Sequence, residues 1–521
     1  MKTELEDVVT GVRFVLRGST PAIAMEARRR ARSLADFTAG RSKEKHGGGK
    51  GGGFMRNCPI LTKDATVLAE DIDGGVQITV TPNDPAKLAE FRATARERFD
   101  RAPLERASIV REEKSDQGET RLYSGSVADL DGDGTLELVA GGFVADANGQ
   151  RPTLVVYRQR GDSWAPLTEA SWDSEPGSTV RNVEIADTDG DGKLDVIALG
   201  RIGASTHVAS AHVTISSLEG GKLVQHARQD WRTGQYSHGY GLAIGDLDGD
   251  GKPEIVTSGF ESDGKTVENG FVRIWKHERK GVIAPHGSVV LDGQGSPSMR
   301  VNDIAIGDVD GDGAPEIVAA GRHGPLKTED SKDLSKRRET GDLAVLSFKH
   351  GQLTILARHS WLRGTSTRFR TVAIADLDGD RKPEIVVGGQ YDGDGKAALV
   401  SLGFESSKLV VKQDASSATE GVTGEVKDLI VARDAKELRL IATGVMGDKP
   451  GRQGTVGAWR VKHGQIVRDA SIVSRNGDET RTRAVLIVPS KHGNKVITIG
   501  HARTGTAVVG QLLQWTGGDL L

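Results

Sequence analysis

The sequence contains a single cysteine, Cys58, among its 521 residues, so no disulfide bond can form within the chain. Aromatic residues make up only 4%, which argues against an extended surface for stacking sugars or bases. No run of 18 apolar residues occurs, and no membrane-spanning helix is predicted. The 69 basic and 72 acidic residues nearly cancel, to a formal net charge of −3, which excludes a polycation that coats nucleic acid.

Glycine, in contrast, is abundant at 68 residues, so the chain turns often. A length of 521 residues exceeds one ordinary core and predicts several domains or a repeat architecture. Five segments match almost letter for letter, with their first aspartates spaced by 58, 59, 62 and 68 residues. Two degenerate copies, anchored near 432 and 488, keep the apolar–turn–apolar–glycine frame without the acids. The sequence therefore has seven repeats.

Each repeat predicts four short strands. In the first repeat, apolar stretches at 126–130, 136–141, 153–158 and 166–172 are separated by turn residues. No helical period separates the acidic segments, which excludes alternating strands and helices. Four strands per ~60 residues predict an all-β fold, a seven-bladed β-propeller with four-stranded blades. The segment 105–114 resembles the fourth strands, and we expect it to close the ring by pairing with the last strand.

The domain prediction has three parts: 1–53 as a flexible tail, 54–102 as a small ββα unit, and 103–521 as the propeller. Within the tail, 22–36 has the composition of a basic helix, although we favour a solvated tail, and 41–53 is a Gly/Lys-rich linker.

The small unit is expected to contain two strands and then a helix that starts at Pro85, with Asp84 as its N-cap. His46, Met55 and Cys58 include soft metal-ligand types, but we interpret them as linker residues beside an idle thiol.

The five acidic segments share the frame D-x-D-G-D-G-x-x-[DE], which places carboxylates at positions 1, 3, 5 and 9 of a tight loop. With the position 7 carbonyl, these are hard oxygen ligands that suit Ca²⁺, for up to five ions. An EF-hand is excluded, because position 12 carries no acid. The alternative is a set of Asp/Gly turns without metal. Arg381 replaces the position 6 glycine in the fifth loop, which predicts a weak or distorted site. The predicted ligands are Asp129, Asp131, Asp133, Thr135, Glu137; Asp187, Asp189, Asp191, Lys193, Asp195; Asp246, Asp248, Asp250, Lys252, Glu254; Asp308, Asp310, Asp312, Ala314, Glu316; and Asp376, Asp378, Asp380, Lys382, Glu384.

These repeats resemble FG-GAP (VCBS-type) repeats, as found in integrin α-subunit propellers and many bacterial surface or secreted proteins. The resemblance covers roughly 103–521, and its loop motif is present in five of the seven repeats. It implies structural calcium in the loops between first and second strands, and an extracellular, periplasmic or cell-surface location. Residues 1–20 show no apolar core of a secretion signal. Members of the family include adhesins, carbohydrate binders and polysaccharide lyases, so membership does not fix the activity.

A ligand site is predicted from positions eight and six residues before each loop, because equivalent positions in a propeller converge on the central channel. This rule predicts a ring of arginines with tyrosine and histidine: Arg121, Tyr123, Arg181, His238, Tyr240, Arg300, Arg368 and Arg370, and Arg483 occupies a similar place in the seventh repeat. Guanidinium groups suit carboxylate, sulfate or phosphate. The alternative is that these arginines only pack between blades or pair with acids.

Two functions follow. We favour a calcium-stabilised, non-catalytic binding or adhesion module for an acidic glycan or a surface protein partner, and expect no nucleic-acid partner. The alternative is a lyase or hydrolase of an acidic polysaccharide that uses His238 or Tyr240 as acid or base. No nucleophile elbow, phosphate loop or catalytic zinc motif is present to support an enzyme.

Overall fold

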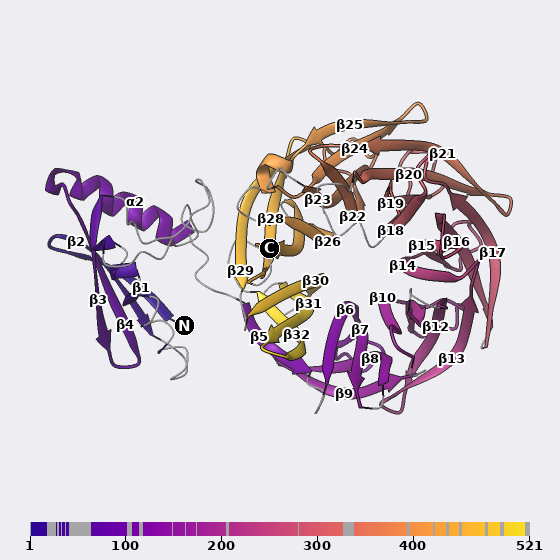
Figure 1. Ribbon diagram of the computed structural model, residues 1–521, viewed down its shortest axis with the longest axis horizontal. Coiled ribbons are helices and arrows are strands. Elements are labelled where there is room, and N and C mark those ends of the chain that lie inside the picture. Colours follow the sequence, from indigo (N-terminus) through magenta and orange to yellow (C-terminus); the bar gives the residue numbers. More distant parts are fainter. Residues whose placement is uncertain are drawn as a thin grey trace. The chain divides into compact units, whose positions relative to one another are not determined.

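The computed structural model describes residues 2–17, 64–101 and 107–515, together with residues 25, 28, 31, 32, 34–36 and 38–40. The last long range has gaps at 114–117, 148, 162, 173–174, 205–207, 280, 327–337, 393–395, 420–422, 434–436, 448–450, 475–477 and 490–493. The chain divides into two compact regions, Met1–Arg106 and Ala107–Leu521 (Figure 1). The predicted linker 41–53 and Cys58 lie outside the described residues.

The N-terminal region is a four-stranded antiparallel sheet in the order β1-β2-β4-β3. Its elements are β1 (Lys2–Val8), β2 (Gly11–Arg17), β3 (Ala65–Ile72), β4 (Gly75–Pro82), the 3-10 turn η2 (Pro85–Lys87) and α2 (Leu88–Arg101). Asp84 caps η2, as predicted, by accepting a hydrogen bond of 3.0 Å from the Ala86 N–H.

The prediction of a flexible tail is wrong for residues 2–17, which form the first two strands. In β2, Val12 and Phe14 alternate with more exposed neighbours and are 0% and 1% exposed, so one face of the strand is core. The described residues between 25 and 38 are helical, and Ala31 and Ala35 pack into the same core. The solvated-tail interpretation is therefore wrong there too.

The larger region consists of the 28 strands β5–β32, whose antiparallel pairings place four strands in each of seven repeats, I to VII. Their bounds are, in I, β6 (Glu119–Ala128), β7 (Glu137–Asp146), β8 (Gly149–Arg160), β9 (Ser163–Ser171); in II, β10 (Thr179–Ala186), β11 (Asp195–Ile202), β12 (Ser210–Glu219), β13 (Lys222–Trp231); in III, β14 (Tyr236–Gly245), β15 (Glu254–Ser262), β16 (Glu268–Arg279), β17 (Val282–Leu291); in IV, β18 (Ser298–Gly307), β19 (Glu316–Gly324), β20 (Thr340–Lys349), β21 (Gln352–Trp361); in V, β22 (Ser366–Ala375), β23 (Glu384–Asp392), β24 (Leu399–Glu405), β25 (Lys408–Asp414); in VI, β26 (Glu425–Arg433), β27 (Leu438–Met446), β28 (Gln453–Lys462), β29 (Gln465–Ser474); and in VII, β30 (Glu479–Val488), β31 (Lys495–Thr504), β32 (Ala507–Trp515) and β5 (Ala107–Glu113). A short 3-10 turn, η5 (Ser416–Thr419), follows β25.

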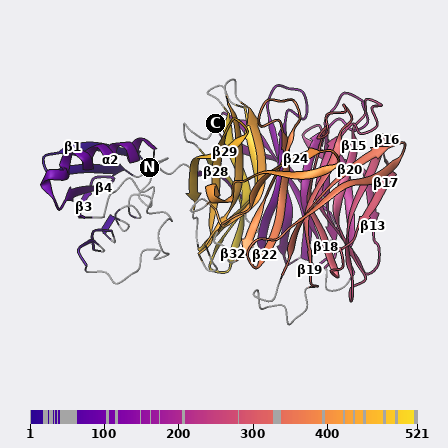
Figure 2. The same ribbon diagram turned by 90° about the horizontal axis from the view of Figure 1, so that it is seen from above.

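The repeats are arranged in a ring, with the first strand of each repeat nearest the centre and the fourth strand at the rim (Figure 1). Figure 2 shows the same ring from the side. Each inner strand contacts the next one around the ring, and β30 contacts β6. The predicted closure is confirmed, because β5 pairs with β32 in an antiparallel ladder from Gly510–Glu113 to Trp515–Ala107.

The hydrophobic core of the ring lies between consecutive repeats, with one cluster at each of the seven interfaces. Between VI and VII, for example, Ile441 and Trp515 are buried together, and the Trp515 indole N–H donates to Thr498 Oγ1 at 2.7 Å. Sheets that bury both faces in this way need the apolar strands that the sequence shows. The predicted all-β, propeller-like fold is therefore confirmed.

Candidate functional site

The inner strands share one irregularity: each changes register with its neighbour at a residue that faces the centre of the ring. We call these seven residues the bulge ring: Tyr123, Arg181, Tyr240, Asn302, Arg370, Lys427 and Arg483. A bulge bends its strand and redirects a side chain. All seven side chains line one central cavity of about 550 Å³.

Six of the nine predicted ligand residues line this cavity, namely Tyr123, Arg181, Tyr240, Arg300, Arg370 and Arg483. The other three predicted residues do not line the cavity. Arg121 pairs with Glu119, and Arg368 pairs with Glu339 and Asp392. His238 is buried beside Arg201, with its Nδ1 3.2 Å from an Arg201 guanidinium nitrogen. For these three, and for most positions eight residues before a loop, the prediction of a cavity-lining side chain is wrong.

The predicted acid–base role of His238 does not fit its surroundings. Burial, together with the positive charge of Arg201, lowers the pKa of His238 to about 2, so the imidazole stays neutral. Tyr240 does face the cavity. Burial alone would raise its pKa, but the guanidinium groups of Arg181 and Arg300 bring it below its usual value.

Two cavity arginines have no acidic partner within ion-pair distance among the residues that the structure describes. The Arg181 guanidinium lies 4.5 Å from the ring centre of Tyr123 and 5.7 Å from that of Tyr240. The Arg483 guanidinium lies 5.5 Å from the Tyr123 ring centre. The Nε atoms of both arginines are buried without a hydrogen-bond partner. Both cations thus face the cavity beside one tyrosine, on the side of repeats I, II and VII.

The opposite side of the cavity is neutralised by acids from neighbouring strands. Arg300 pairs with Glu268 at 2.5 Å, and Arg322 with Glu339 at 2.8 Å. Glu425 forms ion pairs with both Arg370, at 3.0 Å, and Lys427, at 2.5 Å. Burial lowers the pKa of Lys427 to about 7. The alternative interpretation of the arginines, pairing with acids, therefore holds for this side only.

Three carboxyl groups missed by the sequence analysis also line the cavity: Glu184, Asp303 and Asp428. Asp303 accepts from the Val372 N–H at 3.0 Å and Asp428 from the Val485 N–H at 2.8 Å, so each fastens the inner strand of the next repeat. Burial, with mutual repulsion, raises the pKa of Glu184 to about 8 and that of Asp303 to about 7. Near neutral pH these groups are therefore at least partly protonated.

In repeats I to V, an acidic loop follows the inner strand. The first aspartate of each loop comes six residues after the bulge-ring residue of the same strand. Each loop is held by its own acids. In loop I, Asp129 accepts from the Gly134 N–H at 2.8 Å, and buried Glu137 accepts from the Leu130 N–H at 3.0 Å. The corresponding bonds recur in loops II to V.

Loop V is not distorted in its backbone, which corrects that part of the prediction. Arg381 adopts the left-handed conformation of the glycines it replaces, with φ of 71°, and its N–H donates to Asp376 at 3.1 Å. A Cβ built at the corresponding glycines of loops I to IV meets no neighbouring atom, which explains why a side chain is tolerated there. The cost is the strain of a non-glycine residue with positive φ.

The donor set of loop IV fits a hard cation. Carboxylate oxygens of Asp308, Asp310 and Glu316 lie within 4.8 Å of one another. Glu316 is 0% exposed, and its Oε1 has no hydrogen-bond partner. Burial, with repulsion from Asp310, raises the pKa of Glu316 to about 7. A Ca²⁺ ion bound by these carboxylates would remove both the repulsion and the unsatisfied oxygen.

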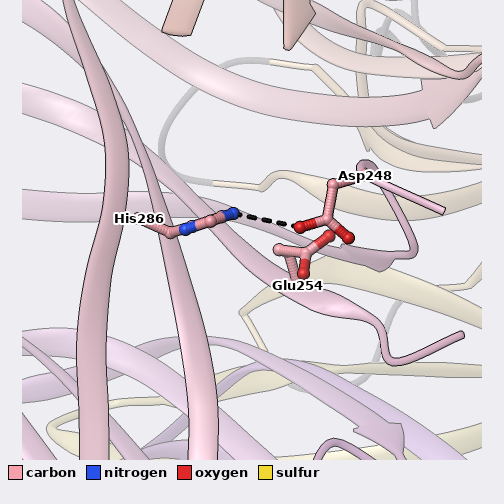
Figure 3. Close-up of side chains that lie close together, drawn as sticks. All are labelled: Asp248, Glu254 and His286. Atoms are coloured by element: carbon pink, nitrogen blue, oxygen red, sulfur yellow. Dashed lines mark hydrogen bonds and ion pairs between the residues drawn. The ribbon is translucent and has the colours of Figure 1, made fainter. Parts of the chain in front are cut away.

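Loop III has an additional side chain beside its acids. His286, from β17, lies 3.2 Å from Asp248 through its Nε2 atom, and Glu254 completes a group within metal-ligand reach (Figure 3). Imidazole is a ligand that Ca²⁺ rarely uses. Loop II also has a histidine beside its position 9 acid, because His277 lies 3.7 Å from Asp195.

A ring of four-stranded repeats, five of them with an acidic turn after the inner strand, defines a propeller-like repeat protein. A sequence model of the FG-GAP-like repeat matches residues 129–198 and 246–319, which contain loops I to IV. These two segments of the chain therefore contain FG-GAP-type repeats. A comparison with curated proteins finds no match.

Several solved structures resemble the fold at low identity. Sqt1 from Chaetomium thermophilum is 11% identical, with a TM-score of 0.40 over 78% of this chain and 100% of its own. A Lactobacillus plantarum protein is 13% identical, with a TM-score of 0.41 over 69% and 87%. A rhamnogalacturonan lyase from Bacillus licheniformis is 14% identical, with a TM-score of 0.35 over 80% and 77%. Such scores carry no inference about function.

Within the described part of the chain, no helix has the length and apolarity needed to cross a membrane.

Proposed function

We propose that the protein is a non-catalytic binding module whose central cavity takes an anionic group of an acidic glycan or of a surface protein partner. The observation that carries this proposal is the pair Arg181 and Arg483, which face the cavity without an acidic partner among the described residues. A half-buried guanidinium without a counterion favours a carboxylate, sulfate or phosphate, which it can bind through two parallel hydrogen bonds. Tyr123, beside both guanidinium groups, helps to hold them in place.

We further propose that calcium in the acidic loops stabilises the ring and takes no part in ligand binding. The inner strand separates each loop from the bulge ring by six residues, or about 20 Å. The likeness to FG-GAP repeats supports an extracellular, periplasmic or cell-surface location, where calcium is abundant enough for loops of modest affinity.

The proposal predicts that replacing both unpaired arginines abolishes binding of an acidic probe. Each charge-assisted hydrogen bond contributes about 1.5–3 kcal/mol, so Arg181→Ala with Arg483→Ala should weaken binding by at least about 100-fold. Binding would be measured by calorimetry with sulfated and uronate oligosaccharides, and with neutral dextran as the reference ligand, at low salt and in calcium.

The matched control is Arg121→Ala with Arg368→Ala, which removes two arginines that do not line the cavity. This variant should keep its affinity within about threefold. Equal loss in both double variants, or equal binding of dextran and the acidic probes, would contradict the proposed site.

Affinity should also depend on pH. As the pH rises from 6 to 8.5, Asp303 and Glu184 lose their protons, because their raised pKa values are about 7 and about 8. Lys427, with a pKa of about 7, loses its positive charge over the same range. Both changes make the cavity less favourable for an anion, by about tenfold in affinity. A sulfated probe, whose own charge is constant here, isolates this effect, and Glu184→Gln should reduce it without abolishing it, because Asp303 and Lys427 still titrate. Affinity that rises with pH would refute this description of the cavity.

A lyase is the second candidate function, supported by one observation. Tyr240 faces the cavity between Arg181 and Arg300, which lower its pKa, as a phenolate base for proton abstraction beside a uronate carboxylate would require. Release of unsaturated oligosaccharides during the titration, lost in Tyr240→Phe while binding persists, would favour this function over the binding module.

A further inference from the structure

The five acidic loops differ at one position on the third strand of their repeat. The strand pairing places Arg158 opposite the position 9 acid in repeat I and Ser217 opposite it in repeat II. Extending the register of the other repeats by one residue places Lys276, Ser347 and Gly403 there in III, IV and V. Two repeats thus have a basic side chain where three have a small neutral residue.

In loop I, Arg158 reaches three of the predicted metal ligands. Its guanidinium contacts Asp131, lies 3.4 Å from Asp133 and donates to Glu137 at 2.6 Å. These acids stand at loop positions 3, 5 and 9. The guanidinium therefore lies among the carboxylates that a bound ion would need.

In loop III, Lys276 makes the equivalent contacts. Its Nζ atom lies 2.6 Å from Asp248, 2.6 Å from Asp250 and 3.4 Å from Glu254, again at positions 3, 5 and 9. An ammonium group at this distance from three carboxylates already supplies the positive charge that a bound cation would otherwise bring to the loop. His286 also contacts Asp248, at 3.2 Å through its Nε2 atom (Figure 3).

In the other three loops, no lysine or arginine of the described residues lies within ion-pair distance of the acids at positions 3, 5 and 9 together, although single basic contacts occur, such as His277 at 3.7 Å from Asp195 in loop II. In loop IV, Lys349 reaches Asp312 alone, at 3.0 Å, and its side chain is 55% exposed. In loop II, Asp195 is satisfied by Ser217 and Thr188, which leaves Asp187, Asp189 and Asp191 as a group. Loop II should therefore be the weakest of the three.

We infer that Arg158 and Lys276 are built-in cations, and that calcium binds only loops II, IV and V. The inference rests on the proposed calcium binding and reduces its stoichiometry from five to three. A Ca²⁺ ion that enters loop I or III must first displace a side chain paired with three carboxylates. In loops II, IV and V no lysine or arginine of the described residues bridges the acids at positions 3, 5 and 9, so an ion can enter without displacing such a side chain.

The test is a calcium titration of chelator-stripped protein by calorimetry, on the full chain. We expect three ions in the wild type, four in Arg158→Ser, four in Lys276→Ser and five in the double variant. Serine is the matched replacement, because Ser217 and Ser347 occupy this position in repeats II and IV. The control Lys349→Ser, which removes a lysine that touches one loop acid, should keep three.

Melting temperature gives a second readout that does not depend on ligand binding. Without calcium, Arg158→Ser and Lys276→Ser should melt several degrees below Lys349→Ser, and calcium should restore them. Five ions in the wild type, or three in a folded double variant, would overturn the inference while calcium binding stands. No calcium bound by any variant would overturn both, whereas anion binding by the cavity would still be tested separately through Arg181 and Arg483.

Discussion

Removing calcium is expected to lower the melting temperature of the protein by about 10 °C. Each loaded loop contributes about 2.7 kcal/mol at a hundredfold excess of calcium over Kd, so three loops contribute about 8 kcal/mol. For a region of roughly 400 residues, an unfolding entropy near 2.1 cal/mol/K per residue converts this loss into about 10 °C. The measurement is thermal unfolding followed by circular dichroism, before and after a chelator.

The physical reason is clearest in loop IV. Without an ion, Glu316 is buried with one unsatisfied oxygen and faces the charges of Asp308 and Asp310. Asp308→Asn should therefore remove about a third of the calcium-dependent shift, whereas Lys349→Ser should leave it unchanged. An identical melting curve with and without chelator, from protein shown by metal analysis to lack calcium at the start, would refute calcium as the stabilising ion.

Much of the ring is predictable, because the acidic motif marks the end of five of the seven inner strands and sets the phase of the repeats. The same phase predicts Tyr123, Arg181, Tyr240 and Arg370, at six residues before the motif, and Arg483 at a similar place in repeat VII. It does not predict Lys427, because repeat VI has lost its acids.

The sequence does not show which side chains of neighbouring repeats form ion pairs. Arg300 is neutralised by Glu268, which belongs to the preceding repeat, and Arg181 has no such partner. This difference depends on side chains 32 residues apart that meet only in the folded ring. Local pattern predicts which residues face the cavity, but the paired and unpaired arginines look identical in sequence.

The N-terminal strands were missed for another reason. β1 and β2 form a hairpin whose partner strand, β4, lies about 60 residues later in the chain. The intervening basic and Gly/Lys-rich segments have the composition of a linker, and this composition outweighed the alternation of Val12 and Phe14 with more polar residues.

The ring should also depend on β5, the strand that closes repeat VII from the N-terminal side of the chain. Deleting residues 1–115 removes β5 and leaves β32 as an open edge, since the ladder from Gly510–Glu113 to Trp515–Ala107 is lost. We expect this variant to aggregate, because an unpaired strand edge pairs with other chains. Deleting residues 1–102 keeps β5, and that variant should stay folded and monomeric, as measured by size-exclusion chromatography and circular dichroism.

A peptide provides the decisive control for closure. Residues 103–115, added in trans to the longer deletion during refolding, should restore soluble protein by adding the missing strand, as extended peptides do at open sheet edges. The contact of the Gln511 side chain with Glu112, at 2.9 Å, helps to fix the register, so a scrambled peptide should fail. If the two deletions behave alike, or if the scrambled peptide works as well as the native one, β5 is not the strand that closes the ring.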